Sequence, residues 1–227
     1  MEYAVRNIYK KYDDLLVLDD ISIEFPANKT TCILGPSGCG KTSLLNILGG
    51  IVEKDGGQVI GFDEIDISFV FQEDRLMEWK NVKDNIGFVL KGRMDKDEID
   101  IVVDKYLELV NLEDYKYYYP RSLSGGMRQR VSILRSFAYP SDLLILDEPF
   151  KSLDINNRQI IIEFLKEVKS RETRTSILVT HDVEEAIDLA DRIVILSDKP
   201  TKVIQVIDNI QENKTSPNFL FSILKSK

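Results

Sequence analysis

Short apolar segments recur along the chain and predict β-strands. In residues 19–25, Ile21, Ile23 and Phe25 alternate with polar residues, which is typical of a strand with one buried face. Residues 143–146 are all apolar, as in a strand covered on both faces. By the same criteria we expect further strands at residues 1–9, 30–34, 59–60, 67–71, 177–179 and 193–196.

Apolar residues that recur three and four positions apart predict helices between these strands. Ile99, Val103 and Tyr106 belong to one such helical face. Another helix is expected to begin near Ser124, and further ones cover residues 41–48, 160–168 and 183–189. Strands that alternate with helices indicate an α/β fold with a parallel sheet. Residues 76–139, by contrast, contain no predicted strand.

Composition and charge exclude several classes of protein. The 227 residues carry a formal net charge of −8, which argues against binding nucleic acid or anionic lipid through a general basic field. No stretch approaches the roughly 20 apolar residues of a membrane-spanning helix. The first residues lack the apolar core of a secretory signal, so we expect a cytosolic protein. The best candidates for a local basic patch are Arg121, Arg128, Arg130 and Arg135.

A glycine-rich loop follows the strand predicted at residues 30–34. Its sequence, GPSGCGKT at residues 35–42, fits the pattern G-x-x-x-x-G-K-[ST] completely. Backbone N–H groups of such a loop surround phosphate oxygens, and the helix that follows adds positive potential. A glycine turn with an incidental lysine would not explain the strand before it and the helix after it. The residues expected to bind nucleotide here are Gly35, Pro36, Ser37, Gly38, Cys39, Gly40, Lys41, Thr42 and Ser43.

Two carboxylates follow the apolar strand at residues 143–146. Asp147 stands at its carboxyl end, where it can hold Mg²⁺ together with the Thr42 hydroxyl. Glu148 comes next and is expected to orient or deprotonate an attacking water. Two acidic residues after a strand often form only a solvated loop. Beside a phosphate-binding loop, however, the pair predicts a nucleotide hydrolase.

A third motif, LSGGMRQ at residues 123–129, lies shortly before that strand. Ser124 is well placed as a helix N-cap, and the two glycines let a phosphate approach exposed N–H groups. An isolated S-G-G sequence is a common turn. Between the other two motifs, however, the segment resembles the signature of ABC transporter ATPases.

The resemblance covers essentially the whole chain and implies a fold. It implies a RecA-like phosphate-loop NTPase core with N-terminal antiparallel β-strands and an inserted α-helical subdomain. We therefore expect one ABC ATPase domain over residues 1–227. Residues 1–75 and 140–227 would form the nucleotide-binding core, and residues 76–139 the helical subdomain.

The resemblance also implies roles for residues outside the three motifs. Gln72 corresponds to a glutamine that contacts Mg²⁺, and His181, the only histidine, to one that touches the γ-phosphate. Tyr12 corresponds to the aromatic residue that stacks on adenine. Residues 152–154 (Ser152, Leu153 and Asp154) correspond to a loop that crosses a dimer interface.

Taken together, these assignments give a candidate site. The implied catalytic residues are Glu148, His181, Gln72 and Lys41. The implied Mg²⁺ ligands are Thr42, Gln72 and Asp147. Further nucleotide contacts are expected from Ser124, Gly125, Gly126, Gln129 and Asp154.

The same resemblance implies partners. They are a second copy of the chain in the ATP-bound state, integral membrane permease subunits, and an extracytoplasmic substrate-binding protein. The chain would then lie in the cytoplasm on the inner face of the cell membrane. The segments FQEDRLMEW at residues 71–79 and YPRSLSGGMRQRV at residues 119–131 are most similar to ATPases of nitrate, sulfonate and taurine importers.

Other functions stay open at this level. One is an exporter-type or non-transport ABC ATPase, although the chain lacks the second cassette and the long coiled-coil insertions common in the latter. Another is an ATP-dependent interaction module with little turnover, which the presence of Glu148, Gln72 and His181 disfavours.

Two residues each have two interpretations. Trp79 either belongs to a groove that receives a permease helix or is a core aromatic of the helical block. The thiol of Cys39 either faces the phosphate site, where the helix dipole and Lys41 would favour its thiolate, or packs with its sulfur turned away. Cys32, by contrast, belongs to a predicted buried strand.

Overall fold

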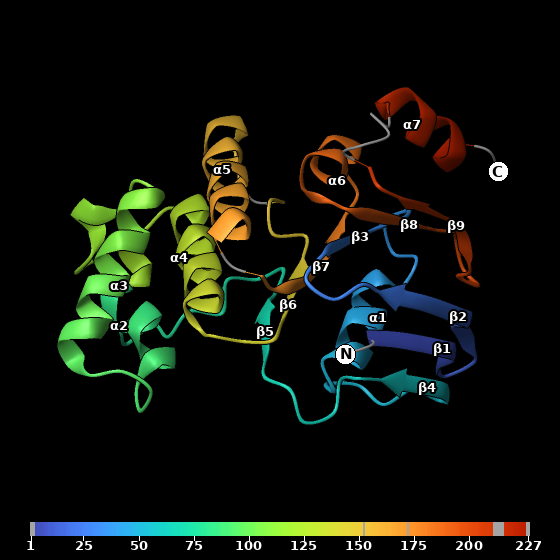
Figure 1. The fold of residues 1–227 in the computed structure, drawn as a ribbon, viewed down its shortest axis with the longest axis horizontal. Coiled ribbons are helices and arrows are strands. Elements are labelled where there is room, and N and C mark those ends of the chain that lie inside the picture. The colour runs from blue at the N-terminus through green and yellow to red at the C-terminus, as the bar shows by residue number, and fades with distance from the viewer. Residues whose placement is uncertain (1–2, 152, 172, 211–215, 226–227) are drawn as a thin grey trace.

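The computed structural model describes residues 3–151, 153–171, 173–210 and 216–225. Its strands are β1 (Tyr3–Tyr12), β2 (Leu15–Phe25), β3 (Thr30–Leu34), β4 (Gly56–Ile60), β5 (Ile67–Val70), β6 (Leu143–Asp147), β7 (Thr175–Thr180), β8 (Arg192–Leu196) and β9 (Val203–Asp208). Its α-helices are α1 (Lys41–Leu48), α2 (Val82–Gly87), α3 (Lys96–Leu109), α4 (Gly125–Ala138), α5 (Ile155–Arg171), α6 (Val183–Leu189) and α7 (Pro217–Lys225). There are also three 3-10 turns, η1 (Phe88–Leu90), η2 (Glu113–Tyr115) and η3 (Pro120–Ser122). Figure 1 shows how the strands and α-helices are arranged.

The strands form two sheets. The smaller sheet has the order β2-β1-β4 and is antiparallel, and the larger has the order β5-β6-β7-β3-β8-β9. In the larger sheet only β9 runs against its neighbour. Strand β3 lies between β7 and β8, so that Cys32 pairs with both Leu178 and Ile193. The predicted α/β fold with antiparallel N-terminal strands is confirmed.

The central strands are buried on both faces and fill two apolar clusters. Ile33 of β3 and Ile145 of β6 pack with α1 and the small sheet, as members of one cluster. Cys32 of β3 and Leu144 of β6 belong to the other cluster, which includes residues of α4, α5 and α6. Because both faces are covered, all five residues of β3 and of β6 are buried and the sequence shows no alternation.

Helices α2, α3 and α4 lie together beyond the β5 side of the large sheet (Figure 1). Asp95 caps α3 by accepting from the N–H groups of Asp97 and Glu98, which explains where that helix begins. Val103 of α3 and Val131 of α4 belong to the same apolar cluster as Leu144 of the sheet. The helices thus occupy the segment where a helical subdomain is predicted. The division at residues 76 and 139 stays a prediction.

Three elements, β9, α2 and α7, are not predicted by the sequence patterns. Helix α2 has only six residues, too few for an apolar repeat to be visible. Strand β9 lies at a sheet edge and alternates half-buried with exposed residues, so it contains no buried apolar run. Among the described helices, none has both the length and the apolar character that crossing a bilayer requires.

Candidate active site

The glycine-rich loop joins β3 to α1 with a backbone that favours glycine. Gly38 and Gly40 have φ angles of 75° and 116°. A Cβ atom at Gly40 would also lie 2.7 Å from Cγ1 of Val17. The hydroxyl of Thr201 donates to the carbonyl of Cys39. The segment around Thr201, far from the loop in sequence, therefore helps to hold the loop in place.

Lys41 places a buried positive charge against this loop. Lys41 is only 4% exposed, and its ammonium donates to the carbonyls of Gly35 and Pro36, each at 2.8 Å. With the N–H groups of the loop and the N-terminus of α1, this charge forms a site suited to phosphate.

The two cysteines are both buried and neither forms a disulfide. Cys39 is 2% exposed and belongs to the apolar cluster on the α1 face of the sheet. The hypothesis of an accessible Cys39 thiol is therefore wrong, because the side chain packs into the core while its backbone follows the loop. Cys32 is fully buried as predicted, and burial raises the pKa of its thiol.

Asp147 ends β6 in a position suited to a metal ligand. The residue is 3% exposed, and this burial raises the pKa of its carboxyl, against the lowering effect of a hydrogen bond from Thr42. Its Oδ1 atom has no hydrogen-bond partner among the described residues. A buried carboxylate with an unused oxygen beside a threonine hydroxyl fits Mg²⁺, which takes oxygen ligands. The described residues contain no cluster of three or more acidic, histidine or cysteine side chains that could hold a metal ion.

Glu148 adopts a backbone conformation that is unusual for its residue type. Its φ is 44°, and its N–H donates to the carbonyl of Val179 of β7 at 2.9 Å. Its Oε2 lies 3.7 Å from Nδ1 of His181 and 3.4 Å from Nζ of Lys151. Left-handed backbone at a non-glycine residue is commonly maintained at functional sites. Glu148 and His181, the residues implied for the attacking water and for the γ-phosphate, thus lie close together, while their roles stay predictions.

Residues of the glycine-rich loop, with Gln72 and Glu148, surround a hollow of about 320 Å³, and Asp147 and His181 are not among the residues that line it. Tyr12 stands at its rim with 43% of its surface exposed, and its hydroxyl donates to Oγ of Ser43 at 3.3 Å. Its ring is therefore available for a base to stack on. Predicted site residues that line the hollow are Tyr12, Ser37, Gly38, Gly40, Lys41, Thr42, Ser43, Gln72 and Glu148. Lys151 and Lys199 line it as well and were not predicted.

The signature segment is built as predicted but does not line this hollow. Ser124 caps α4 by accepting from the N–H of Met127 at 3.2 Å, and Ser124 and Gly125 are exposed. Gly125 lines a neighbouring hollow, which shares Gln72 and Lys151 with the first. Within one chain, the glycine-rich loop and Ser124 are thus parts of different surfaces.

Two further predicted contacts have other partners in the structure. Gln129 is 3% exposed and its side-chain amide donates to the carbonyl of Pro149 at 3.1 Å. Asp154 is exposed and accepts from the N–H and the side-chain amide of Asn157 at 2.9 and 2.7 Å, at the start of α5. Their contacts with nucleotide stay predictions, and Ser152 lies outside the described residues.

A network of hydrogen bonds and ion pairs, which the sequence analysis did not predict, stabilises the loop that contains His181. Asp182 caps α6, and its N–H donates to the hydroxyl of Thr180, which in turn contacts the buried carboxylate of Glu185. Arg158 of α5 contacts Asp182 at 2.8 Å and Glu185 at 3.1 Å. Burial raises the pKa of Glu185. Arg158 and Glu185 are missed because no local pattern links residues so far apart.

The structure decides the alternatives for Trp79 and the arginines. Trp79 is 76% exposed and is therefore not a core aromatic. Arg128 pairs with Asp74 at 3.0 Å, and Arg130 is buried and donates to the carbonyl of Val110. Arg135 likewise donates to the backbone of residues 74 and 75. The guanidinium groups of Arg128, Arg130 and Arg135 thus contact other parts of the chain, whereas Arg121 is exposed.

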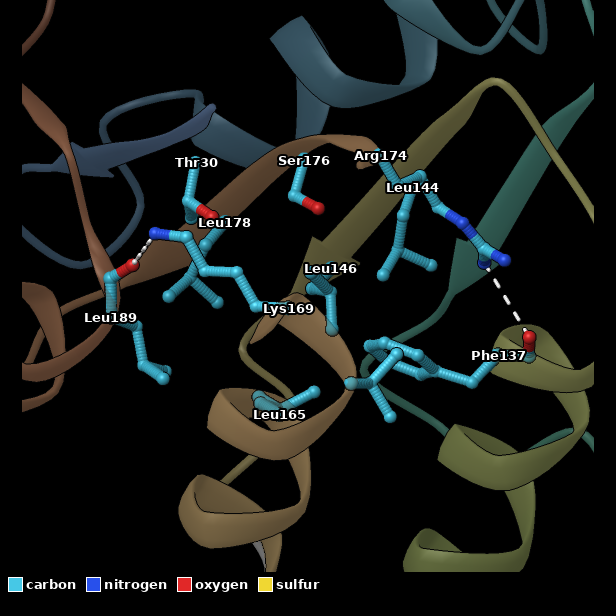
Figure 2. A pocket seen from close by; sticks show the side chains of 11 residues that line it. Thr30, Phe137, Leu144, Leu146, Leu165, Lys169, Arg174, Ser176, Leu178 and Leu189 are labelled. Atoms are coloured by element: carbon cyan, nitrogen blue, oxygen red, sulfur yellow. Dashed lines mark hydrogen bonds between the residues drawn. The ribbon is translucent and has the colours of Figure 1, made fainter. Parts of the chain in front are cut away.

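A separate pocket lies on the helical side of the large sheet (Figure 2). Leu144, Leu146 and Leu178 of the sheet line it, together with Leu165 of α5. Its volume of about 40 Å³ has room for little more than a water molecule. It contains none of the predicted site residues, and it is a packing gap, not the active site.

Comparisons with known proteins agree with this geometry. The family described as "ABC transporter" matches residues 18–151. The sulfate/thiosulfate import ATP-binding protein CysA 1 of Agrobacterium fabrum is 37% identical, over 99% of this chain and 68% of its own length. The chain belongs to the ABC transporter family. A CysA protein of Nocardia farcinica is 40% identical, over 86% of this chain and 62% of its own length.

Solved structures of ABC cassettes have the same fold. A dimeric ATP-binding cassette in a post-hydrolysis state, bound to ADP and Pi, aligns with a TM-score of 0.81 and 27% identity, over 92% of this chain and 98% of that one. A second dimeric structure, of a bacterial ABC transporter cassette, aligns with a TM-score of 0.80.

The predictions of an ABC cassette, of ATP binding and of an ATPase are thus confirmed at the level of the family. The chain spans about two thirds of the length of the CysA relatives. Their names concern sulfate and thiosulfate, so the expected nitrate, sulfonate and taurine subtype is not confirmed.

Proposed function

We propose that this ABC ATPase drives the import of a small oxyanion by hydrolysing ATP together with membrane permease subunits. The observation that carries the proposal is that Lys41 and Glu148 line one hollow. Directly behind it lies the buried Asp147 with its unused oxygen, and His181 lies 3.7 Å from Glu148. The names of the relatives support import, and sulfate, thiosulfate, nitrate, sulfonate and taurine share an oxyanion group.

In this mechanism each residue has a role in positioning or charge stabilisation. Tyr12 stacks on adenine, and Lys41 with the loop N–H groups binds the β- and γ-phosphates. Glu148 accepts a proton from, or orients, the water that attacks in line. His181 contacts the γ-phosphate.

Mg²⁺, when bound, would neutralise phosphate charge, and Thr42, Asp147 and Gln72 are the residues that would hold it. The unused Oδ1 of Asp147 supports this assignment.

A head-to-tail dimer would complete the site. Ser124 and Gly125 are exposed at the N-terminus of α4, away from the hollow of their own chain, and are free to meet the nucleotide of a second copy. Gln129 and Asp154 would support this surface from the signature helix and from the start of α5. The likeness to dimeric cassettes supports the arrangement.

The permease and a substrate-binding protein are the further proposed partners, and they would place the chain on the inner face of the cell membrane. The exposed Trp79, next to Glu78, supports a docking groove in this region, because a large exposed aromatic residue is often a binding anchor.

The test is the variant Glu148→Gln, which removes a carboxylate and keeps its shape. Phosphate release from MgATP should fall by roughly 10²–10⁴, while nucleotide binding is retained. An ATP-bound dimer should then be visible by size-exclusion chromatography. Near-normal turnover would refute the role of Glu148.

With the permease in proteoliposomes, uptake of labelled sulfate, thiosulfate, taurine and nitrate tests the substrate class. Efflux without uptake would instead identify an exporter.

A further inference from the structure

A second lysine, Lys151, lies at the hydrolytic end of the nucleotide hollow. Its N–H donates to the carbonyl of Glu148 at 3.2 Å, and this turn returns the side chain toward the same residue. Its ammonium lies 3.4 Å from Oε2 of Glu148, the oxygen that His181 also approaches. Nearly half of the Lys151 side chain is exposed, against 14% for Glu148. The Lys151 side chain is therefore much more open to solvent than the carboxylate that it contacts.

The negative charges around this end of the hollow favour a cation. Asp147 and Glu148 are adjacent carboxylates, and a terminal phosphate beside them adds negative charge in a partly buried place. Lys41, which is proposed to bind the β- and γ-phosphates, lies on the loop side, beside the carbonyls of Gly35 and Pro36. Lys151 lines both the nucleotide hollow and its neighbour, with Gln72 common to the two. It is thus the cation that approaches from the side of Glu148.

We propose that Lys151 is a nucleotide-specificity residue, whose ammonium binds the terminal phosphate of ATP and so favours ATP over ADP. The inference rests on the proposed function, because it assumes that the hollow binds ATP with the γ-phosphate beside Glu148. In the structure described here the ammonium contacts Glu148. With ATP bound it would contact a phosphate oxygen that ADP lacks, through a charge-assisted hydrogen bond.

Lys199 offers a matched control. It lines the same hollow, but it belongs to the segment in which Thr201 donates hydrogen bonds to the carbonyls of Val17 and Cys39. It therefore approaches from the side of β2 and the Tyr12 rim. A lysine there has no reason to distinguish ATP from ADP.

The experiment is titration calorimetry of the full chain with MgADP and with the non-hydrolysable analogue MgAMP-PNP. We expect Lys151→Met to raise the Kd of MgAMP-PNP by about tenfold and that of MgADP by less than about twofold. Lys151→Arg, which keeps the charge, should restore most of the preference. Lys199→Met should leave the ratio of the two Kd values unchanged.

The outcomes separate this inference from the proposed function. If the wild type binds neither nucleotide, both are overturned. If it binds both and Lys151→Met changes the two Kd values equally or not at all, Lys151 is only a surface partner of Glu148, and the ATPase stands. If Lys151→Met melts more than a few degrees lower than the wild type, Lys151→Gln takes its place under the same criteria.

Discussion

The ion-pair network under the His181 loop gives a quantitative prediction for Arg158→Met. Arg158 has 27% of its side chain exposed, and Glu185, which it contacts at 3.1 Å, only 7%. Removing the guanidinium leaves Glu185 with the hydroxyl of Thr180 but without a cation. Breaking a buried ion pair by removing one partner costs about 3–5 kcal/mol. Because water reaches Arg158 in part, we expect a loss of about 2–3 kcal/mol.

The loss should depend on pH with a defined sign. Burial raises the pKa of Glu185 in the folded state, so its ionisation opposes folding, and stability due to this group falls as pH rises through that pKa. Arg158 lowers the pKa of Glu185, so removing Arg158 raises that pKa further and enlarges the penalty at neutral pH. It disappears as pH falls below the unfolded pKa of about 4.3, because the neutral carboxyl needs no cation. The difference in free energy of unfolding between wild type and variant should therefore become smaller as the pH is lowered.

Thermal unfolding at pH 7.5 and pH 5 measures both effects. In a domain of this size about 2–4 °C of Tm corresponds to 1 kcal/mol, so the neutral-pH shift should be about 4–12 °C. Arg171→Met is the control on the same helix. Its pair with Glu167 is shorter, at 2.6 Å, but its side chain is 56% exposed, so we expect a loss of stability of about 0.5 kcal/mol or less. A Tm shift no larger than that control, or one equal at both pH values, would show that the network does not act as described.

Two further predictions concern assembly. If each site is shared between two copies, Ser124→Arg and Lys41→Ala chains should each be inactive alone and should regain phosphate release when they are mixed. A verified mixed dimer without activity would exclude shared sites. If the surface beside Trp79 contacts the permease, Glu78→Lys should reduce transport in proteoliposomes and leave the ATPase activity of the isolated chain unchanged. If permease binding and transport are both unchanged, the docking groove lies elsewhere.

The sequence predicts those parts of the molecule that depend on local pattern. Strand β3 is identified because its five apolar or small residues stand before a glycine-rich loop, and α4 because Ser124 caps an amphipathic run. The order of strands in the sheet depends instead on pairing between residues that are far apart in the sequence. Nothing in residues 30–34 specifies β7 and β8 as neighbours, although alternation of strands and helices predicts that the sheet is parallel.

The same distinction applies to the site. Lys41, Asp147 and Glu148 are found from motifs, since their chemistry requires fixed spacing. Lys151 lies only three residues beyond Glu148, yet its contact depends on the turn between them, which the sequence does not define. The Cys39 thiol was open to two interpretations because a phosphate-binding loop has one side toward the ligand and another toward the core, and spacing cannot distinguish them.

The central position of β3 has a consequence for the synthesis of the chain on the ribosome. Residues 31–34 precede the phosphate-binding loop, but they pair with residues 177–180 and 192–195. The small antiparallel sheet needs only residues 3–60 and can form early, whereas β3 has both its neighbours only once β8 has emerged. Until then a strand whose five residues are all buried in the folded protein is exposed, a state that favours aggregation. Translation arrested before residue 175 should therefore yield nascent chains that bind chaperones and cannot retain nucleotide.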